Sequence, residues 1–229
     1  MKIKRLKWDS DFFGFGIAKL LPGRIEKINE YAKNNKIRLV WCLANIKKSK
    51  NINLLEQNGF EFVDLKITFS IESHLKKTKA VHLARKEDIF DLKKIAHKAF
   101  VKDSRFNHKN IDKRRVDKFY ESWVEKAVEG TFDDCCFVTK TKGGIAGFAT
   151  YKRIGSANSS IGLIAVADGY RGLGIGSKLV SRCVDFAYEE GRNALTVSTE
   201  GKNIAAQNFY IKNGFAITKI ESWYYKWTS

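Results

Sequence analysis

The sequence predicts an α/β (α+β) fold, in which helices cover a mixed central sheet and a partial N-terminal unit precedes a complete one. Three observations predict it: a helix–strand–helix–strand pattern that occurs twice, regular apolar spacing through the second half of the chain, and a glycine-rich segment between a strand and a helix. With 229 residues, 44% of them hydrophobic, the chain can build one large domain or two small ones.

The repeated pattern ends each time in Asn-Gly-Phe followed by a β-rich tail. Its last helix lies within 51–60 in the first copy and within 203–215 in the second, so the copies start about 150 residues apart. Asn-Gly is a common helix end and chance is the alternative, but four successive elements agree. We therefore expect a partial domain at 1–75 and a complete domain at 78–229. The preceding helices and strands lie at 24–35 and 37–44 in the first copy, and at 178–191 and 193–200 in the second.

The complete domain is expected to begin with a short strand and two amphipathic helices. Apolar residues recur at helical spacing from Ile89 to Phe100 and again from Val116 to Val128, and Gly130 ends the second helix. A hairpin then turns at Lys142-Gly143-Gly144. In order, the expected elements are a strand at 80–84, helices at 85–100 and 116–128, strands at 135–140, 145–153 and 159–166, a helix at 177–190, and the strand, helix and strand of the second copy.

A glycine-rich segment, Arg171–Gly176 (R-G-L-G-I-G), lies between the last of these three strands and the long helix. Glycines let the backbone approach a ligand closely, and a helix start offers free N–H groups and a positive dipole end, so the segment suits a phosphate or pyrophosphate. A dinucleotide-binding loop requires G-x-G-x-x-G after the first strand, and a P-loop requires Gly-Lys-Ser/Thr, so this segment departs from both patterns. A glycine turn without a ligand remains an alternative.

The pattern Arg-x-x-Gly-x-Gly at 171–176, with the order of elements around it, resembles the acyl-CoA pyrophosphate loop of the GNAT superfamily of N-acyltransferases. The resemblance implies a GNAT fold preceded by a partial GNAT-like domain, acetyl-CoA as cosubstrate and no metal. It also implies that a backbone N–H near Ile164–Val166 stabilises the oxyanion. The cofactor-binding residues that it implies are Ile164, Ala165, Val166, Arg171, Gly172, Leu173, Gly174, Ile175, Gly176, Asn203 and Phe209.

Tyr210 lies on the helix of the second copy, on the face that also carries Asn203. A phenol with a pKa of about 10 can protonate a thiolate whose thiol has a pKa of about 8.5. Spacing alone favours an ordinary core aromatic beside Phe209, whereas the resemblance implies that Tyr210 is the general acid. The general base is not evident from the sequence.

The resemblance extends to GNAT members that acetylate nucleotide-linked amino sugars, through patches at 8–14, 99–106, 119–123 and 130–133. It implies a dTDP-4-amino-4,6-dideoxyhexose as acceptor; an antibiotic, another small amine or a protein N-terminus is the alternative. Phe13, Arg105 and His108 are the acceptor candidates, because arginine binds phosphates bidentately and aromatic rings stack on a base or sugar. The alternatives are that Phe13 seals the domain junction and that Arg105 and His108 lie in a solvated loop.

The net charge of +17 favours anionic partners, including phosphorylated ligands, although a solvated lysine surface explains much of it. Nucleic acid is not expected, because the basic residues are scattered and no nucleic-acid-binding motif occurs. Four cysteines without a C-x-x-C pair, together with the absence of a signal peptide and of an 18-residue apolar run, predict a cytoplasmic protein without a membrane partner. The aromatic segment 221–227 predicts either a homodimer edge or a core strand.

Overall fold

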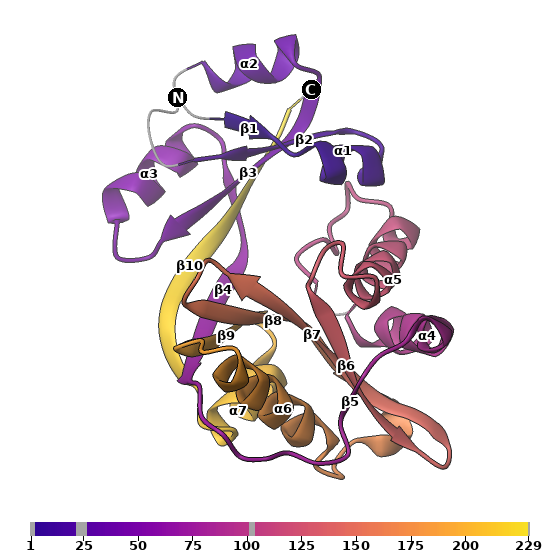
Figure 1. Cartoon of the computed structure of the whole chain (residues 1–229). Helices are drawn as coiled ribbons and strands as arrows, with labels where there is room; N and C mark the ends of the chain where they lie inside the picture. Colours follow the sequence, from indigo (N-terminus) through magenta and orange to yellow (C-terminus); the bar gives the residue numbers. More distant parts are fainter. Residues whose placement is uncertain (1–2, 22–26, 101–103, 229) are drawn as a thin grey trace.

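The computed structural model describes residues 3–21, 27–100 and 104–228. Within these residues, ten strands form one mixed sheet in the order β1-β2-β3-β10-β4-β9-β8-β7-β6-β5 (Figure 1). The N-terminal elements are β1 Ile3–Arg5, α1 Lys7–Phe13, β2 Gly16–Leu20, α2 Ile28–Asn34, β3 Ile37–Asn45, α3 Ser49–Gln57 and β4 Glu61–Glu72. The remaining elements are β5 His82–Leu83, η1 Lys86–Asp88, α4 Ile89–Ala99, α5 Lys113–Val128, β6 Cys135–Thr141, β7 Gly144–Ile154, β8 Asn158–Val166, η2 Asp168–Tyr170, α6 Ile175–Glu189, β9 Ala194–Glu200, α7 Ile204–Lys212 and β10 Ala216–Trp227.

The order of elements predicted for residues 78–229 is confirmed, but several boundaries differ, among them the start of the second helix, which lies at Lys113 and not at 116. The first strand contracts to His82–Leu83, because Ala80 has a φ of 62°, which interrupts an extended backbone. The first helix begins with the single 3-10 turn η1, where the N–H of Arg85 donates to Asp88. The long helix starts two residues early, at Ile175, directly after Gly174 in the left-handed region. In the first copy, the predicted helix 24–35 begins in residues 24–26, which lie outside the described residues.

Two layers of helices bury the sheet. On one face, α4 and α5 pack on β6, β7 and β8 through Leu92, Val116, Phe119 and Phe148. On the opposite face, α6 covers the same strands with an apolar stripe that includes the fully buried Leu179. Helices α2 and α3 pack on β3 in a separate cluster. The site described below lies where β8 and β9 meet these layers.

Both copies of the predicted repeat contribute to the centre of the sheet. Strand β10 pairs with β3 and β4, and β4 pairs with β10 and β9, so the last strand of each copy lies between the last two strands of the other copy (Figure 1). The two registers match as well, since Glu221 lies opposite Asn45 just as Lys66 lies opposite Glu200. The division into domains 1–75 and 78–229 remains a prediction, while the strands of both segments share one sheet.

The structure corrects how the two copies align. Ser49 and Ile204 start equivalent helices and Glu61 and Ala216 start equivalent strands, and both pairs are 155 residues apart. The same shift superimposes Asn58 on Asn213, and each of these side chains donates to a backbone carbonyl four residues earlier. Asn203, however, superimposes on Lys48, so its match with Asn51 was a coincidence of sequence.

The aromatic segment at the C-terminus forms core rather than an edge. Trp223, Tyr224 and Tyr225 are buried, and β10 is hydrogen-bonded on both sides. This strand therefore cannot supply a dimer edge, and a homodimer remains an untested expectation. The four cysteines form no disulfide, and Cys183 lies on the face of α6 that packs in the core.

Candidate active site

The glycine-rich segment connects β8 to α6 through the turn η2, as predicted. Gly172 and Gly174 have φ values of 79° and 73°, a region that glycine enters without strain. Arg171 and Leu173 project outward with most of their side chains exposed, and Arg171 forms an ion pair with Asp168 at 3.0 Å. The loop thus presents its backbone and one guanidinium to solvent.

The N-terminus of α6 has no side-chain cap and no acidic residue in its first turn. Helix α5, by contrast, is capped by Asp112, and α7 by Asn203, whose side chain accepts the N–H of Ala206 at 3.0 Å. The predicted cofactor residue Asn203 therefore uses its side-chain oxygen to begin α7. The first N–H groups of α6 and its positive dipole end remain free to hold an anion.

Strands β8 and β9 separate just before this loop. Their parallel pairing ends at Ile161 and Val197, although β8 continues to Val166 and β9 to Glu200. We call the space between residues 162–166 and 198–200 the fork. On the other side of β8, Leu163 and Ala167 donate their N–H groups toward β7. Because alternate residues of a strand point to opposite edges, the N–H groups of Ile164 and Val166 point into the fork.

Three of the predicted cofactor residues meet beside the fork. A Cβ added to Gly176 would lie 3.1 Å from the ring of Phe209 and 3.6 Å from Cγ2 of Val166. Glycine at this position therefore lets α6 and α7 approach each other closely. Among the remaining predicted residues, Ile175 is buried and Ile164 is half-buried in the core under α6, whereas Ala165 is buried on the opposite face of the sheet, under α4 and α5.

Tyr210 is buried on α7, where it packs against Phe69, Phe209 and Phe215. Burial raises the pKa of its hydroxyl, and the nearby Glu200 carboxylate raises this pKa further. The phenol consequently stays protonated throughout the neutral range. Tyr210 thus has the core packing that spacing alone favours, together with the protonation state that an acid requires.

The acceptor candidates occupy three different environments. Arg105 lies over the rings of Phe106 and Trp223, 3.9 and 4.0 Å from their centroids, and donates to the Tyr225 hydroxyl over 2.6 Å. His108 stacks on Trp227, with the ring centroids 5.2 Å apart. Phe13 is buried among aromatic rings, including those of Phe106 and Phe119, so it supports this wall from within the core.

The guanidinium of Arg105 is the centre of a polar group that sequence spacing did not bring together. It donates a single hydrogen bond to the described residues, although an arginine carries five N–H donors. Its charge lowers the pKa values of Asp9 and Glu200, while burial, the larger effect, raises both. We call Asp9, Arg105, Glu200 and Tyr225 the Arg105 cluster. Asp9 lies on α1, Arg105 in the segment that precedes α5, Glu200 on β9, and Tyr225 on β10. No local pattern in the sequence predicts this cluster.

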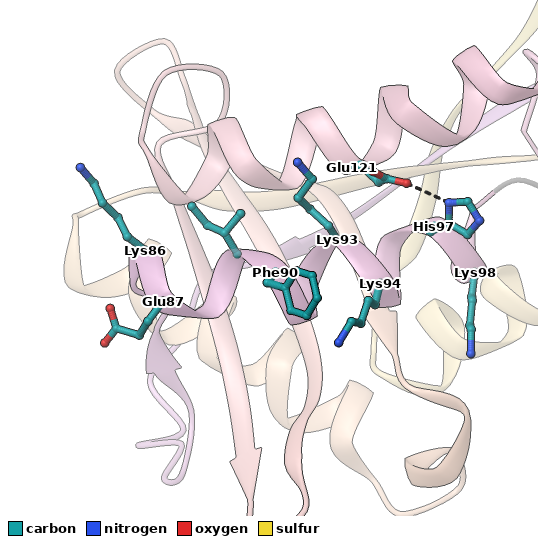
Figure 2. Close-up of a pocket in the computed structure, with 9 residues that line it drawn as sticks. Lys86, Glu87, Phe90, Lys93, Lys94, His97, Lys98 and Glu121 are labelled. Atoms are coloured by element: carbon teal, nitrogen blue, oxygen red, sulfur yellow. Dashed lines mark hydrogen bonds and ion pairs between the residues drawn. The ribbon is translucent and has the colours of Figure 1, made fainter.

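Two lysines of α4 extend the charged surface of the loop. Lys94 and Lys98 line a cavity of about 240 Å³ together with Val166, Asp168 and Arg171. They also border a larger groove of about 700 Å³ on the outer face of α4, where Phe90 is 70% exposed (Figure 2). Acidic residues balance much of that groove, since Lys94 pairs with Asp91 and His97 with Glu121.

The described residues contain no group of three or more histidine, cysteine or acidic side chains arranged to hold a metal ion. In the same part of the chain, no helix is long and apolar enough to cross a membrane.

Comparisons with known proteins agree with this geometry. Residues 97–215 match the acetyltransferase (GNAT) family. The chain is 27% identical to a dTDP-fucosamine acetyltransferase of Escherichia coli over 98% of this chain and 97% of that protein. It is 35% identical to a streptothricin acetyltransferase of Streptomyces lavendulae over 38% of this chain and 47% of that protein. A solved N-acetyltransferase from Sphaerobacter thermophilus has a similar fold, with a TM-score of 0.63 at 13% identity, over 98% of this chain and 76% of that one.

Proposed function

The chain belongs to the GNAT family of acetyltransferases, and from this premise we propose that it transfers the acetyl group of acetyl-CoA to a nucleotide-linked amino sugar, a dTDP-4-amino-4,6-dideoxyhexose. The similarity to the dTDP-fucosamine acetyltransferase carries the proposal for the acceptor. That similarity spans nearly all of both chains, including the N-terminal segment outside the family match, which contributes Asp9 to the Arg105 cluster.

Acetyl-CoA supplies a thioester, whose acyl carbon accepts an amine and whose thiolate leaves. The loop Arg171–Gly176 fits the pyrophosphate, because the N–H groups of α6 lack a capping side chain and two glycines take up left-handed turns. Arg171, Lys94 and Lys98 add positive charge beside these N–H groups. Asn203 and Phe209 flank the cofactor from the start and middle of α7.

The fork positions the reacting atoms. The N–H groups of Ile164 and Val166 donate to the acyl oxygen as negative charge develops on it, which is an interaction worth several kcal/mol in a site that excludes water, on the order of 3 kcal/mol per donor. Tyr210 gives its proton to the leaving thiolate as general acid. Its raised pKa keeps the phenol in its protonated form over the whole neutral range.

Arg105 binds the nucleotide diphosphate of the acceptor. Aromatic rings on two sides hold its guanidinium in place, and its remaining donors can form the paired hydrogen bonds that a phosphate accepts. His108 and Trp227 form a stacked pair on which the thymine ring can lie, and Phe13 backs Phe106 from the core.

The alternative acceptor is a cationic antibiotic, which the similarity to streptothricin acetyltransferase over a shorter segment favours. The net charge of +17 opposes such a substrate. Initial rates of thiol release from acetyl-CoA would be compared for a dTDP-4-amino-4,6-dideoxyhexose, the same amino sugar without its nucleotide, and streptothricin. We expect the nucleotide-linked sugar to have the highest kcat/KM, and a preference for either of the other two would refute the assigned acceptor.

A further inference from the structure

Glu200 is the last residue of β9 and lies on one wall of the fork. Pairing of β8 with β9 ends at Ile161 opposite Val197, and three further residues along each strand lead to Ile164 and Glu200. Glu200 therefore lies across the fork from the N–H group that we assign to the acyl oxygen. An amine that attacks the acyl carbon must enter this space.

The face of β9 that carries Glu200 is the one toward Arg105 and Tyr225. Leu195 and Val197 point into the core under α6, so Thr196, Ser198 and Glu200 point to the opposite face, where Ser198 is exposed. The charge of Glu200 raises the pKa values of Tyr120, Tyr210 and Tyr225, so its carboxylate lies near the proposed acid as well as near the other members of the Arg105 cluster.

The charged groups around Glu200 tune its basicity in opposite directions. Burial raises the pKa of its carboxyl and Asp64 raises it further, whereas Arg105 and Lys202 lower it. Lys66 lies opposite Glu200 in the β4–β9 ladder, and burial lowers the pKa of its ammonium. A carboxyl with a pKa above its usual range is a stronger base than an exposed one and still loses its proton near neutrality.

The first copy of the repeat provides an internal comparison. The 155-residue shift that superimposes α3 on α7 places Asn45 at the position of Glu200 and Leu55 at that of Tyr210. Asn45 ends its strand and accepts the N–H of Lys47, so the fold itself needs no carboxylate there. The copy without the glycine-rich loop thus lacks both ionisable groups, and the copy with the loop has both.

We propose that the carboxylate of Glu200 is the general base that removes a proton from the acceptor's ammonium group, an assignment that rests on the proposed acetyl transfer. An N–H bond of the ammonium breaks and an O–H bond forms on Glu200. The amine nitrogen then bonds to the acyl carbon as the carbon–sulfur bond breaks, and the thiolate takes the Tyr210 proton. A second proton from the nitrogen restores Tyr210, and Glu200 releases its proton to solvent.

The test is the dependence of kcat/KM on pH for the wild type and for Glu200→Gln, Glu200→Asp and Glu200→Asn, the last being the residue of the first copy. We expect Glu200→Gln and Glu200→Asn to lower kcat/KM for the amine about 100-fold near neutral pH, in line with general-base catalysis. The deficit should shrink as the pH approaches the pKa of the amine, which then arrives unprotonated. Glu200→Asp should restore part of the rate, and the affinity for acetyl-CoA should not change in any variant.

Glu72→Gln is the matched control, because Glu72 is exposed at the far end of the same β4–β9 ladder. A deficit that stays equal at every pH, or a Glu200→Gln rate within about threefold of the wild type, would overturn the assignment while leaving the acetyl transfer intact. A wild type that acetylates no acceptor would remove the proposed function and the role of Glu200 together. Thermal unfolding of Glu200→Asn shows whether this variant is still folded, so that a loss of the general base can be distinguished from a loss of structure.

Discussion

The indole Nε1 of Trp123 donates a hydrogen bond of 2.7 Å to Oδ2 of the buried Asp133. The same oxygen accepts the hydroxyl of Thr150 at 2.6 Å, and Thr150 in turn accepts the N–H of Leu163 at 2.8 Å. A register shift between β7 and β8 lies at this point. This chain of hydrogen bonds fixes β8 where it leaves β9, and so holds the fork open.

Thr150→Val should therefore lower both the stability of the protein and its kcat. The variant keeps the shape of the side chain but removes one of the two hydrogen bonds that Oδ2 of Asp133 accepts. It also leaves the buried N–H of Leu163 without its partner, which costs about 1–3 kcal/mol. Denaturant unfolding measures the loss of stability, and steady-state kinetics measure the loss of kcat. Thr218→Val on the exposed start of β10 is the control, and equal stability of the two variants would contradict this role.

Gly174→Ala should strain the start of α6. Its φ of 73° costs an alanine roughly 1–2 kcal/mol, and relief of that strain would move the N–H groups that we assign to the pyrophosphate. We expect weaker binding of acetyl-CoA by calorimetry and a lower unfolding temperature. Gly169→Ala is the control, because this residue has open space around it and an ordinary φ, and it should change neither the affinity for acetyl-CoA nor the unfolding temperature. An unchanged affinity in Gly174→Ala would argue against the loop as the cofactor site.

Tyr210→Phe should lower kcat about 100-fold without weakening acetyl-CoA binding, because it removes only the hydroxyl that we assign as acid. Since burial raises the pKa of Tyr210 in the folded state, the native protein retains that proton at a pH where the unfolded chain loses it. The contribution of this buried phenol to stability should therefore be constant below about pH 10 and fall as the pH rises above it. Denaturant unfolding should show a shallower alkaline decline in Tyr210→Phe, and an identical decline would contradict the burial of this group.

Arg105→Lys tests whether a guanidinium is needed and not merely a positive charge. Lysine cannot form paired hydrogen bonds with a diphosphate, so we expect the KM for the nucleotide sugar to rise about tenfold while the KM for acetyl-CoA stays the same. Arg114→Lys on the exposed surface of α5 serves as the control. Equal increases in both KM values would indicate that Arg105 supports the structure of the protein and does not bind the acceptor.

Local sequence signals predicted the parts of the structure that depend on local physics. Periodicity gave the order of elements after residue 78, and the glycines of 171–176 predicted a turn opening a helix. The exchange of β4 and β10 was not predictable, because two alternating strands of similar pattern do not specify which neighbour each will pair with. Asp9 and Glu200 were missed because both are distant from Arg105 in the sequence, and only the folded chain brings them close to it.

Phe13 shows that local reasoning leaves the role of an aromatic residue open. Its place in an aromatic patch near the N-terminus predicted a substrate contact, but only 2% of its surface is exposed, and it packs against Phe119 of α5. Sequence cannot distinguish an aromatic ring that lines a site from one that supports the residues lining it. His108 and Arg105 differ from Phe13 in that neither is fully buried.

Mass spectrometry of the reaction products tests most directly whether the chain transfers the acetyl group of acetyl-CoA to a nucleotide amino sugar. The purified chain would be incubated with acetyl-CoA and dTDP-4-amino-4,6-dideoxygalactose, and thiol release would be followed in parallel. We expect one N-acetylated nucleotide sugar for each thiol released, at a rate that Tyr210→Phe sharply reduces. Thiol release without an acetylated sugar, or an acetylated sugar formed equally fast without the protein, would contradict this expectation.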